Sequence, residues 1–134
     1  MGRTLAIRIE VLAFAAVVPL LMRLRLTTLE RILEPRRPAR ASPGQAREVA
    51  FHVEAALAHG SRIFSTTCLT RALTRYFFLR RVGVPLTLCF GIGWPEGAPA
   101  AHCWLLREGE PFLEARDPRP LFAETYRIPS PGSP

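Results

Sequence analysis

The hydrophobic period of the sequence changes near Gly83, and this change constrains the fold more than any other feature. Residues 68–82 place apolar side chains on one stripe with helical spacing, and a glycine just after them is typical of a helix end. Residues 85–94 then alternate with the period of two that is typical of a strand. Further strands are predicted over residues 101–107 and 111–115. A helix that gives way to consecutive strands predicts an α+β fold with a small antiparallel sheet.

The part of the chain before residue 68 is predicted to be helical. Residues 4–34 repeat apolar side chains at helical intervals, with Pro19 as a kink or break between two segments. Residues 35–41, P-R-R-P-A-R-A, are too polar and proline-rich to be buried and are typical of a linker. Another helix is expected to begin with Ser42 as its N-cap and to end after His59, with Gly60 as its C-terminal cap. We therefore expect an N-terminal helical segment with its linker over residues 1–41, a core over residues 42–128 and a flexible tail over residues 129–134.

An apolar run over residues 11–22, preceded by Arg3 and Arg8, has a loose likeness to a signal peptide. The run is about half of the ~20 residues that are needed to span a bilayer. Arg23 and Arg25 also stand where a cleavage site needs small residues. We therefore expect a helix that packs on the core, docks a partner or makes peripheral contact with a membrane.

The composition is that of a globular protein, with 134 residues of which 49% are hydrophobic and 22% charged. The formal charge of +7 comes entirely from arginine, because the 18 basic residues include no lysine. No nucleic-acid recognition motif accompanies the arginines, so we expect no nucleic-acid partner. The three cysteines form no C-x-x-C pair, which argues against a disulfide framework and a zinc site and fits reduced thiols in the cytoplasm. We expect no metal and no cofactor.

Cys68 is the candidate nucleophile. Thiols react as thiolates, and the first turn of a helix favours an anion. Cys68 opens a predicted helix, and the preceding residues 65–67, S-T-T, supply capping oxygens. His102, on the second predicted strand, can reach the N-terminus of such a helix as a general base. His52 and His59 belong to the upstream helix, where we expect a surface role or a favourable interaction with the helix dipole.

Three motifs follow one another here: C-L-T-R-A-L at residues 68–73, R-R-V-G-V-P at residues 80–85 and A-H-C-W at residues 101–104. They resemble the lasso-peptide leader peptidases, which are transglutaminase-like, papain-like cysteine proteases with the pattern C-L-x-x-A-L, R-R-x-G-V-P and A-H-A-W. The resemblance covers residues 68–126, nearly half of the chain. It implies a transglutaminase-like core in which a cysteine at a helix N-terminus packs on a small sheet. It also implies that Cys68 and the histidine of the third motif are catalytic.

The third catalytic residue stays open between Glu114 and Asp117. The family usually has an acidic residue about a dozen positions after its histidine, which falls on Glu114. Strand alternation depends on loop length: a two-residue loop at Glu108 and Gly109 puts Asp117 on the face of His102, and a three-residue loop puts Glu114 there. We expect Glu114, which would hold the imidazole in the tautomer that accepts the thiol proton.

The other two cysteines are expected to be structural. Cys103 stands where the family commonly has alanine and is a rival nucleophile, but as a strand neighbour of His102 it points to the opposite face. We expect a small buried side chain there and at Cys89. For Cys68 the alternative is also a buried core cysteine. Trp104 shares the face of His102 and either walls the site or belongs to the core.

The resemblance implies a protease that removes the leader from a ribosomally made lasso-peptide precursor. It implies three partners: the precursor peptide, a separate leader-binding protein and an ATP-dependent cyclase. The alternatives are a transglutaminase-like transamidase or deamidase with another substrate, and a non-catalytic adaptor of a peptide-maturation complex. Replacement of Cys68 separates the adaptor from the enzymes, and the masses of the products separate proteolysis from the other reactions.

Overall fold

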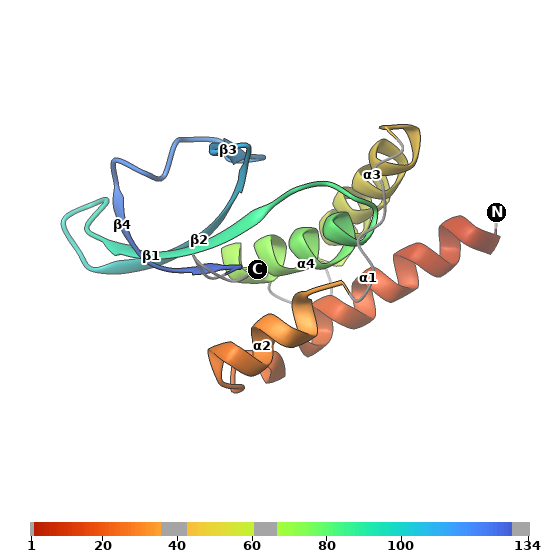
Figure 1. Ribbon diagram of the computed structural model, residues 1–134, viewed down its shortest axis with the longest axis horizontal. Helices are drawn as coiled ribbons and strands as arrows, with labels where there is room; N and C mark the ends of the chain where they lie inside the picture. Colours follow the sequence, from red (N-terminus) through yellow and green to blue (C-terminus); the bar gives the residue numbers. More distant parts are fainter. Residues whose placement is uncertain (1, 36–42, 61–66, 130–134) are drawn as a thin grey trace. The chain divides into compact units, whose positions relative to one another are not determined.

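The computed structural model describes residues 2–35, 43–60 and 67–129 (Figure 1). Its contacts divide the chain into two compact units, Met1–Val84 and Pro85–Pro134, which we call the helical unit and the sheet unit. The predicted α+β class is confirmed, with helices in the first unit and an antiparallel sheet in the second. Residues 36–41 of the predicted linker and residues 130–134 of the predicted tail lie outside the described residues.

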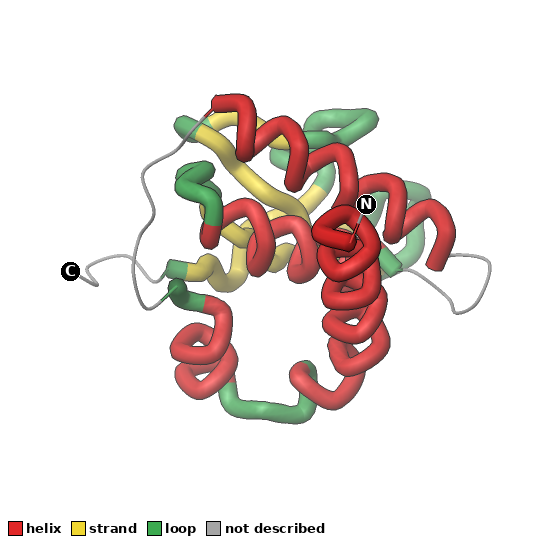
Figure 2. The backbone as a smooth tube through the Cα atoms, turned by 90° about the vertical axis from the view of Figure 1, so that its right-hand side faces the viewer, coloured by secondary structure: helices red, strands yellow, loops and turns green. Residues whose placement is uncertain are grey.

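The described residues of the helical unit form four helices, drawn in red in Figure 2. They are α1 (Gly2–Leu21), α2 (Leu26–Leu33), α3 (Pro43–Gly60) and α4 (Cys68–Arg81). The first helix contacts both α3 and α4. Gly60 is the last residue of α3 and not a residue beyond its end, and the predicted N-cap Ser42 is outside the described residues.

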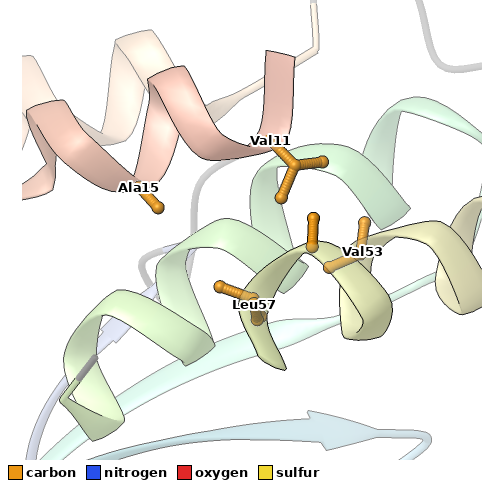
Figure 3. Close-up of a cluster of buried hydrophobic side chains, with 5 residues drawn as sticks. Val11, Ala15, Val53 and Leu57 are labelled. Atoms are coloured by element: carbon orange, nitrogen blue, oxygen red, sulfur yellow. The ribbon is translucent and has the colours of Figure 1, made fainter. Parts of the chain in front are cut away.

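The core of the helical unit forms where α1 meets α3. Val11 and Ala15, one helical turn apart, are buried against Val53, Ala56 and Leu57. Figure 3 shows the side chains from the two helices facing one another. The spacing of three and four residues on each helix is what brings these apolar groups to one side. Val53, Ala56 and Leu57 therefore form the buried face of α3.

The break between the first two helices falls later than Pro19. Helix α1 continues through Pro19 to Leu21, and a short loop over residues 22–25 precedes α2. A proline lacks the N–H that would bond to the carbonyl four residues earlier, and here only two residues of the helix follow this disturbed bond. The expected break was thus correct in kind and misplaced by a few residues.

Glu34, the C-cap of α2, fastens that helix to α4. Its carboxylate accepts a hydrogen bond of 3.0 Å from the Tyr76 hydroxyl and one of 2.8 Å from Arg80. Arg81, the next residue of α4, donates a hydrogen bond of 2.9 Å to the carbonyl of Phe77, and its guanidinium carbon lies 3.4 Å from the centroid of the Phe77 ring. These basic side chains lie in the last turn of α4, where cations also interact favourably with the helix dipole. These contacts stabilise the C-terminal end of α4, the helix whose first residue is Cys68.

The sheet unit has four strands in the order β3-β2-β1-β4, all antiparallel (Figure 1). They are β1 (Thr87–Gly93), β2 (Ala100–Arg107), β3 (Glu110–Phe112) and β4 (Phe122–Ile128). The first three match predicted strands. The fourth was not predicted, although its aromatic and β-branched residues are typical of a strand.

The hairpin between β2 and β3 has the two-residue loop considered in the sequence. Arg107 pairs with Glu110, and the loop residues Glu108 and Gly109 have φ angles of 52° and 82°. Positive φ at both positions is typical of the turn whose twist matches that of the adjoining strands. This loop length is the one for which strand alternation alone favours Asp117 as the acid.

The third strand is shorter than predicted. It ends at Phe112 rather than Ala115, and the next residue, Leu113, has a φ angle of 57°. A non-glycine residue in this left-handed region turns the chain out of the extended conformation. Alternation of faces therefore stops at Phe112 and no longer decides where the following acidic side chains point.

Candidate active site

Cys68 is the first residue of α4, and its side chain is exposed. The residue before it, Thr67, has extended backbone angles, and its hydroxyl accepts a hydrogen bond of 3.3 Å from the Thr70 amide. The predicted start of this helix is therefore confirmed. No acidic residue lies in the first turn, so no like charge opposes an anion there. The alternative of a buried core cysteine is wrong for Cys68.

His102 and Glu114 lie side by side in the sheet unit. The Nε2 atom of His102 is 3.4 Å from Oε2 of Glu114, at the long end of the hydrogen-bond range. Both side chains are about one-fifth exposed, so solvent reaches the pair only in part. A carboxylate on Nε2 fixes the ring orientation and leaves Nδ1 to face another partner.

Asp117, the alternative acid, is engaged elsewhere. It accepts hydrogen bonds from the amide and guanidinium of Arg119, the shortest of them 2.8 Å. These hydrogen bonds hold the pKa of Asp117 below its usual range. The same arginine also reaches the carboxylate of Glu110 at 3.2 Å. Within the described residues, Glu114 is the acid that lies beside His102.

The imidazole of His102 is enclosed by two aromatic rings. Trp104 lies nearly parallel to it, with ring centroids 5.8 Å apart, and Phe122 lies at 5.0 Å. Trp104 is buried, and its Nε1 has no hydrogen-bond partner among the described residues. The expectation that Trp104 shares the face of His102 is confirmed. Phe122 was missed because β4 was not predicted.

Gly91 makes room for this arrangement. It is the strand partner of His102 across β1 and β2, and a Cβ atom there would lie 2.7 Å from the Trp104 ring. A side chain would therefore push the indole away from the imidazole, or force the strands apart. Glycine inside a strand often marks such a close approach, which is the signal in the sequence that could have indicated this position.

Gly91→Ala is expected to lower activity and to destabilise the sheet unit by about 1–3 kcal/mol, because a tightly packed site is overfilled. Turnover and the midpoint of urea unfolding measure the two effects. Gly44→Ala is the matched control, since nothing lies within 4 Å of a Cβ at that position. Full activity in the Gly91 variant would show that the indole is not needed at this distance from His102.

The two remaining cysteines are buried, as predicted. Cys103 pairs with Phe90 across the sheet while its neighbour His102 pairs with Gly91, so the two side chains point to opposite faces. Cys89 lies on the face of His102 in a small cluster with Trp104. Burial raises the pKa of the Cys89 thiol to about 12, and a hydrogen bond with Glu124 adds to the effect.

Iodoacetamide is expected to modify Cys68 in the folded protein before the other two thiols. Cys68 is exposed, whereas Cys89 and Cys103 are at most 3% exposed, and the raised pKa of Cys89 keeps it protonated at neutral pH. Peptide mass mapping after short labelling measures the order. The same labelling in urea should modify all three thiols, and early modification of Cys89 in the folded chain would contradict the assignment.

The two histidines of α3 differ from one another. His59 is exposed, as expected for the last turn of a helix. His52 is 7% exposed, and its Nδ1 is buried without a hydrogen-bond partner among the described residues, so the expected surface role is wrong for it. Position 52 lies beside the buried Val53 in the middle of α3, where the packing of α3 and not its end decides the exposure.

The described part of the chain contains no group of three or more His, Cys, Asp or Glu side chains that could hold a metal ion. The structure brings His102 and Glu114 together with Trp104 and Phe122 in the sheet unit. Cys68 belongs to the helical unit. A cysteine, a histidine and a carboxylate are the residue types of a cysteine hydrolase triad.

Comparison with known protein families gives one match. Residues 11–127 match the transglutaminase-like superfamily, a region that begins within α1 and ends within β4. No curated protein and no solved structure matches the chain. Cysteine peptidases and transglutaminases both occur in this superfamily. Because the match covers most of the sequence, the chain belongs to the transglutaminase-like superfamily.

Proposed function

We propose that this chain is a cysteine peptidase that removes the leader from a lasso-peptide precursor, with Cys68, His102 and Glu114 as its triad. The observation that carries the proposal is the pairing of His102 Nε2 with Glu114 at 3.4 Å. It is supported by an exposed cysteine at the first position of α4 and by membership of the transglutaminase-like superfamily. The three motifs in residues 68–104 favour the leader peptidases within that superfamily.

In the proposed reaction, Nδ1 of His102 takes the proton of the Cys68 thiol, because Nε2 faces Glu114. The sulfur attacks the carbonyl carbon of the bond between leader and core. The C–N bond breaks, the amine of the core leaves with the proton from the imidazole, and the leader stays on the sulfur as a thioester. Water then attacks the thioester, His102 accepts a proton from the water, and the released thiolate is reprotonated.

Glu114 acts through the imidazole in this reaction. Its carboxylate accepts the Nε2 proton and so keeps Nδ1 unprotonated and directed to the thiol. It also stabilises the imidazolium that forms when the sulfur loses its proton. The aromatic rings of Trp104 and Phe122 limit the rotation of the imidazole and keep water away from one side of it.

The proposed setting is the cytoplasm, with the precursor peptide, a separate leader-binding protein and an ATP-dependent cyclase as partners. These assignments rest on the likeness of the motifs to the leader peptidases. The arginine-rich surface of a chain with a formal charge of +7 suits acidic stretches on a peptide or protein partner.

The proposal predicts that a precursor-like peptide and a leader-binding protein are encoded in neighbouring reading frames. The test is to incubate the protein with these two partners and to measure intact masses. Two fragments that add up to the precursor plus water support the peptidase. An intact precursor whose mass shows deamidation or an added amine would instead support the transamidase or deamidase. In those reactions the cysteine sulfur forms a thioester with a glutamine side chain and releases ammonia, and an amine or water then takes the acyl group from the sulfur. An unchanged precursor in a mixture that contains all partners would contradict both activities.

A further inference from the structure

Helix α1 presents an apolar face that the described structure leaves uncovered. Leu5, Ile9 and Leu20 are 62%, 57% and 61% exposed. At 100° per residue these side chains fall on one stripe along the helix, together with smaller exposed residues. We call this face the outer stripe, and it comprises Leu5, Ile9, Ala13, Ala16, Val17 and Leu20. A contiguous exposed apolar strip of this kind indicates contact with something other than water.

The hydropathy of α1 is unusual for a helix of a globular core. The window Thr4–Leu21 has a mean hydropathy of 2.0, which by length and composition is enough to cross a membrane, and only 17% of it is buried. The apolar segment is therefore longer than the run over residues 11–22 that the sequence pattern singled out. A core helix of equal hydropathy would be mostly buried.

Other features of α1 indicate that it lies on a membrane rather than across one. Its inner face, with Val11, Ala15 and Val18, is at most 2% exposed, and the first two pack into the core with α3. A spanning helix would have to give up this packing. It would also carry Arg8 and Glu10 into the hydrocarbon, which is expensive unless they are paired.

Basic groups accompany the outer stripe. Arg23 and Arg25 are exposed directly after the helix, beside the exposed side chain of Leu24. A hollow of about 410 Å³ between α1 and α3 is lined by Leu5 and Ile9 of the stripe and by Arg8 and other side chains. The Nε atom of Arg8 is buried and has no hydrogen-bond partner among the described residues. Arg8 thus places a further basic side chain beside Leu5 and Ile9 of the stripe.

We propose that the outer stripe of α1 rests on an anionic phospholipid bilayer, with its apolar side chains below the headgroups and Arg8, Arg23 and Arg25 at the level of the phosphates. The combination of an apolar strip with basic groups beside it and after its C-terminal end is typical of helices that lie in the membrane interface. A formal charge of +7 draws the chain to an anionic surface and adds to the attraction of the stripe.

Vesicle flotation tests the proposal with the full chain and two vesicle compositions, pure phosphatidylcholine and an equal mixture with phosphatidylglycerol. The protein should float with the anionic vesicles and lose much of this binding in high salt. The affinity of the triple variant Leu5→Gln, Ile9→Gln, Leu20→Gln for the anionic vesicles should be lower by about tenfold or more, because three large apolar side chains no longer enter the bilayer. Arg23→Gln with Arg25→Gln should lower binding to the anionic vesicles only.

The matched control replaces exposed apolar side chains of the sheet unit. Ile92→Thr with Leu113→Asn removes two groups that are each 50% exposed, and asparagine tolerates the positive φ at position 113. This variant should float like the unchanged chain, and circular dichroism should show all variants folded. Equal loss of binding in the control, or unchanged binding in the stripe variant, would overturn the proposal.

Two further outcomes would also overturn it. If the unchanged chain ignores both vesicles but forms dimers that the stripe variant does not form, the stripe is a protein interface. If alkaline carbonate fails to release the protein from cell membranes, α1 spans the bilayer. Release by carbonate together with flotation on anionic vesicles supports a surface-bound helix. None of these measurements depends on peptidase activity.

Discussion

Cys68→Ala is expected to abolish cleavage of the precursor, with a fall in turnover of about 10³-fold or more. The thioester forms on the Cys68 sulfur in the proposed reaction, and no other described thiol can replace it. Cys89 and Cys103 are at most 3% exposed, and burial raises the pKa of Cys89 to about 12. Quantitative mass spectrometry of leader and core over time measures the rate.

Cys103→Ala is the matched control for this variant. It removes a thiol from the residue next to His102 and places there the alanine that is common in the leader peptidases. Its activity should stay close to that of the unchanged chain. If cleavage survives in Cys68→Ala and is lost in Cys103→Ala, the nucleophile has been misassigned. If processing is undiminished in Cys68→Ala while all partners are present, the chain acts as an adaptor.

Glu114→Ala is expected to lower kcat by roughly 10²- to 10⁴-fold with little change in KM, as for the loss of the acid from other triads. Without the carboxylate, nothing fixes the proton on Nε2 of His102 or stabilises the imidazolium. The binding surface for the peptide keeps its side chains, so the effect should appear in turnover. Steady-state rates at several precursor concentrations separate the two constants.

Asp117→Ala removes a carboxylate only three residues further along the chain. Because Asp117 is bound to Arg119 and not to His102, its loss should leave kcat nearly unchanged. A large fall in kcat for Asp117→Ala with none for Glu114→Ala would exchange the roles of the two acids. The pair of variants thus decides the question that strand alternation left open.

Much of the fold could be predicted from local signals. The start of α4 follows from the capping threonine before Cys68, and its end from Gly83, whose φ angle of 88° suits glycine. Strand β1 follows from apolar residues at alternate positions over residues 85–94, and the turn between β2 and β3 from a glutamate and glycine pair. Each of these signals lies within a few residues of the feature it determines.

Features that depend on distant packing could not be predicted in the same way. The outer strand β4 has mostly polar or exposed residues, so its weak pattern was overlooked until pairing with β1 defined it. The burial of His52 depends on packing within the helical unit and not on its neighbours in sequence. The end of β3 depends on the positive φ of Leu113, which nothing in the sequence demands.

The position of Glu114 beside His102 also shows that a local pattern fails where the chain bends. For the two-residue loop that the structure has, alternation favoured Asp117, whereas the family spacing favoured Glu114. The chain leaves the extended conformation at Leu113, so counting faces beyond that residue gives the wrong side. The family's spacing between histidine and acid agrees with the position of Glu114, because a spacing taken from folded proteins already includes any bend between the two residues.

Because of the bend at Leu113, the proposed acid Glu114 and the proposed base His102 are carried by different kinds of backbone structure. His102 is held by a strand with neighbours on both sides, while Glu114 is carried by the irregular segment between β3 and β4. Segments of this kind accept insertions and substitutions that a central strand does not. The proposed third member of the triad can therefore be replaced through changes in one surface connection, while the strand pairing that holds His102 stays intact.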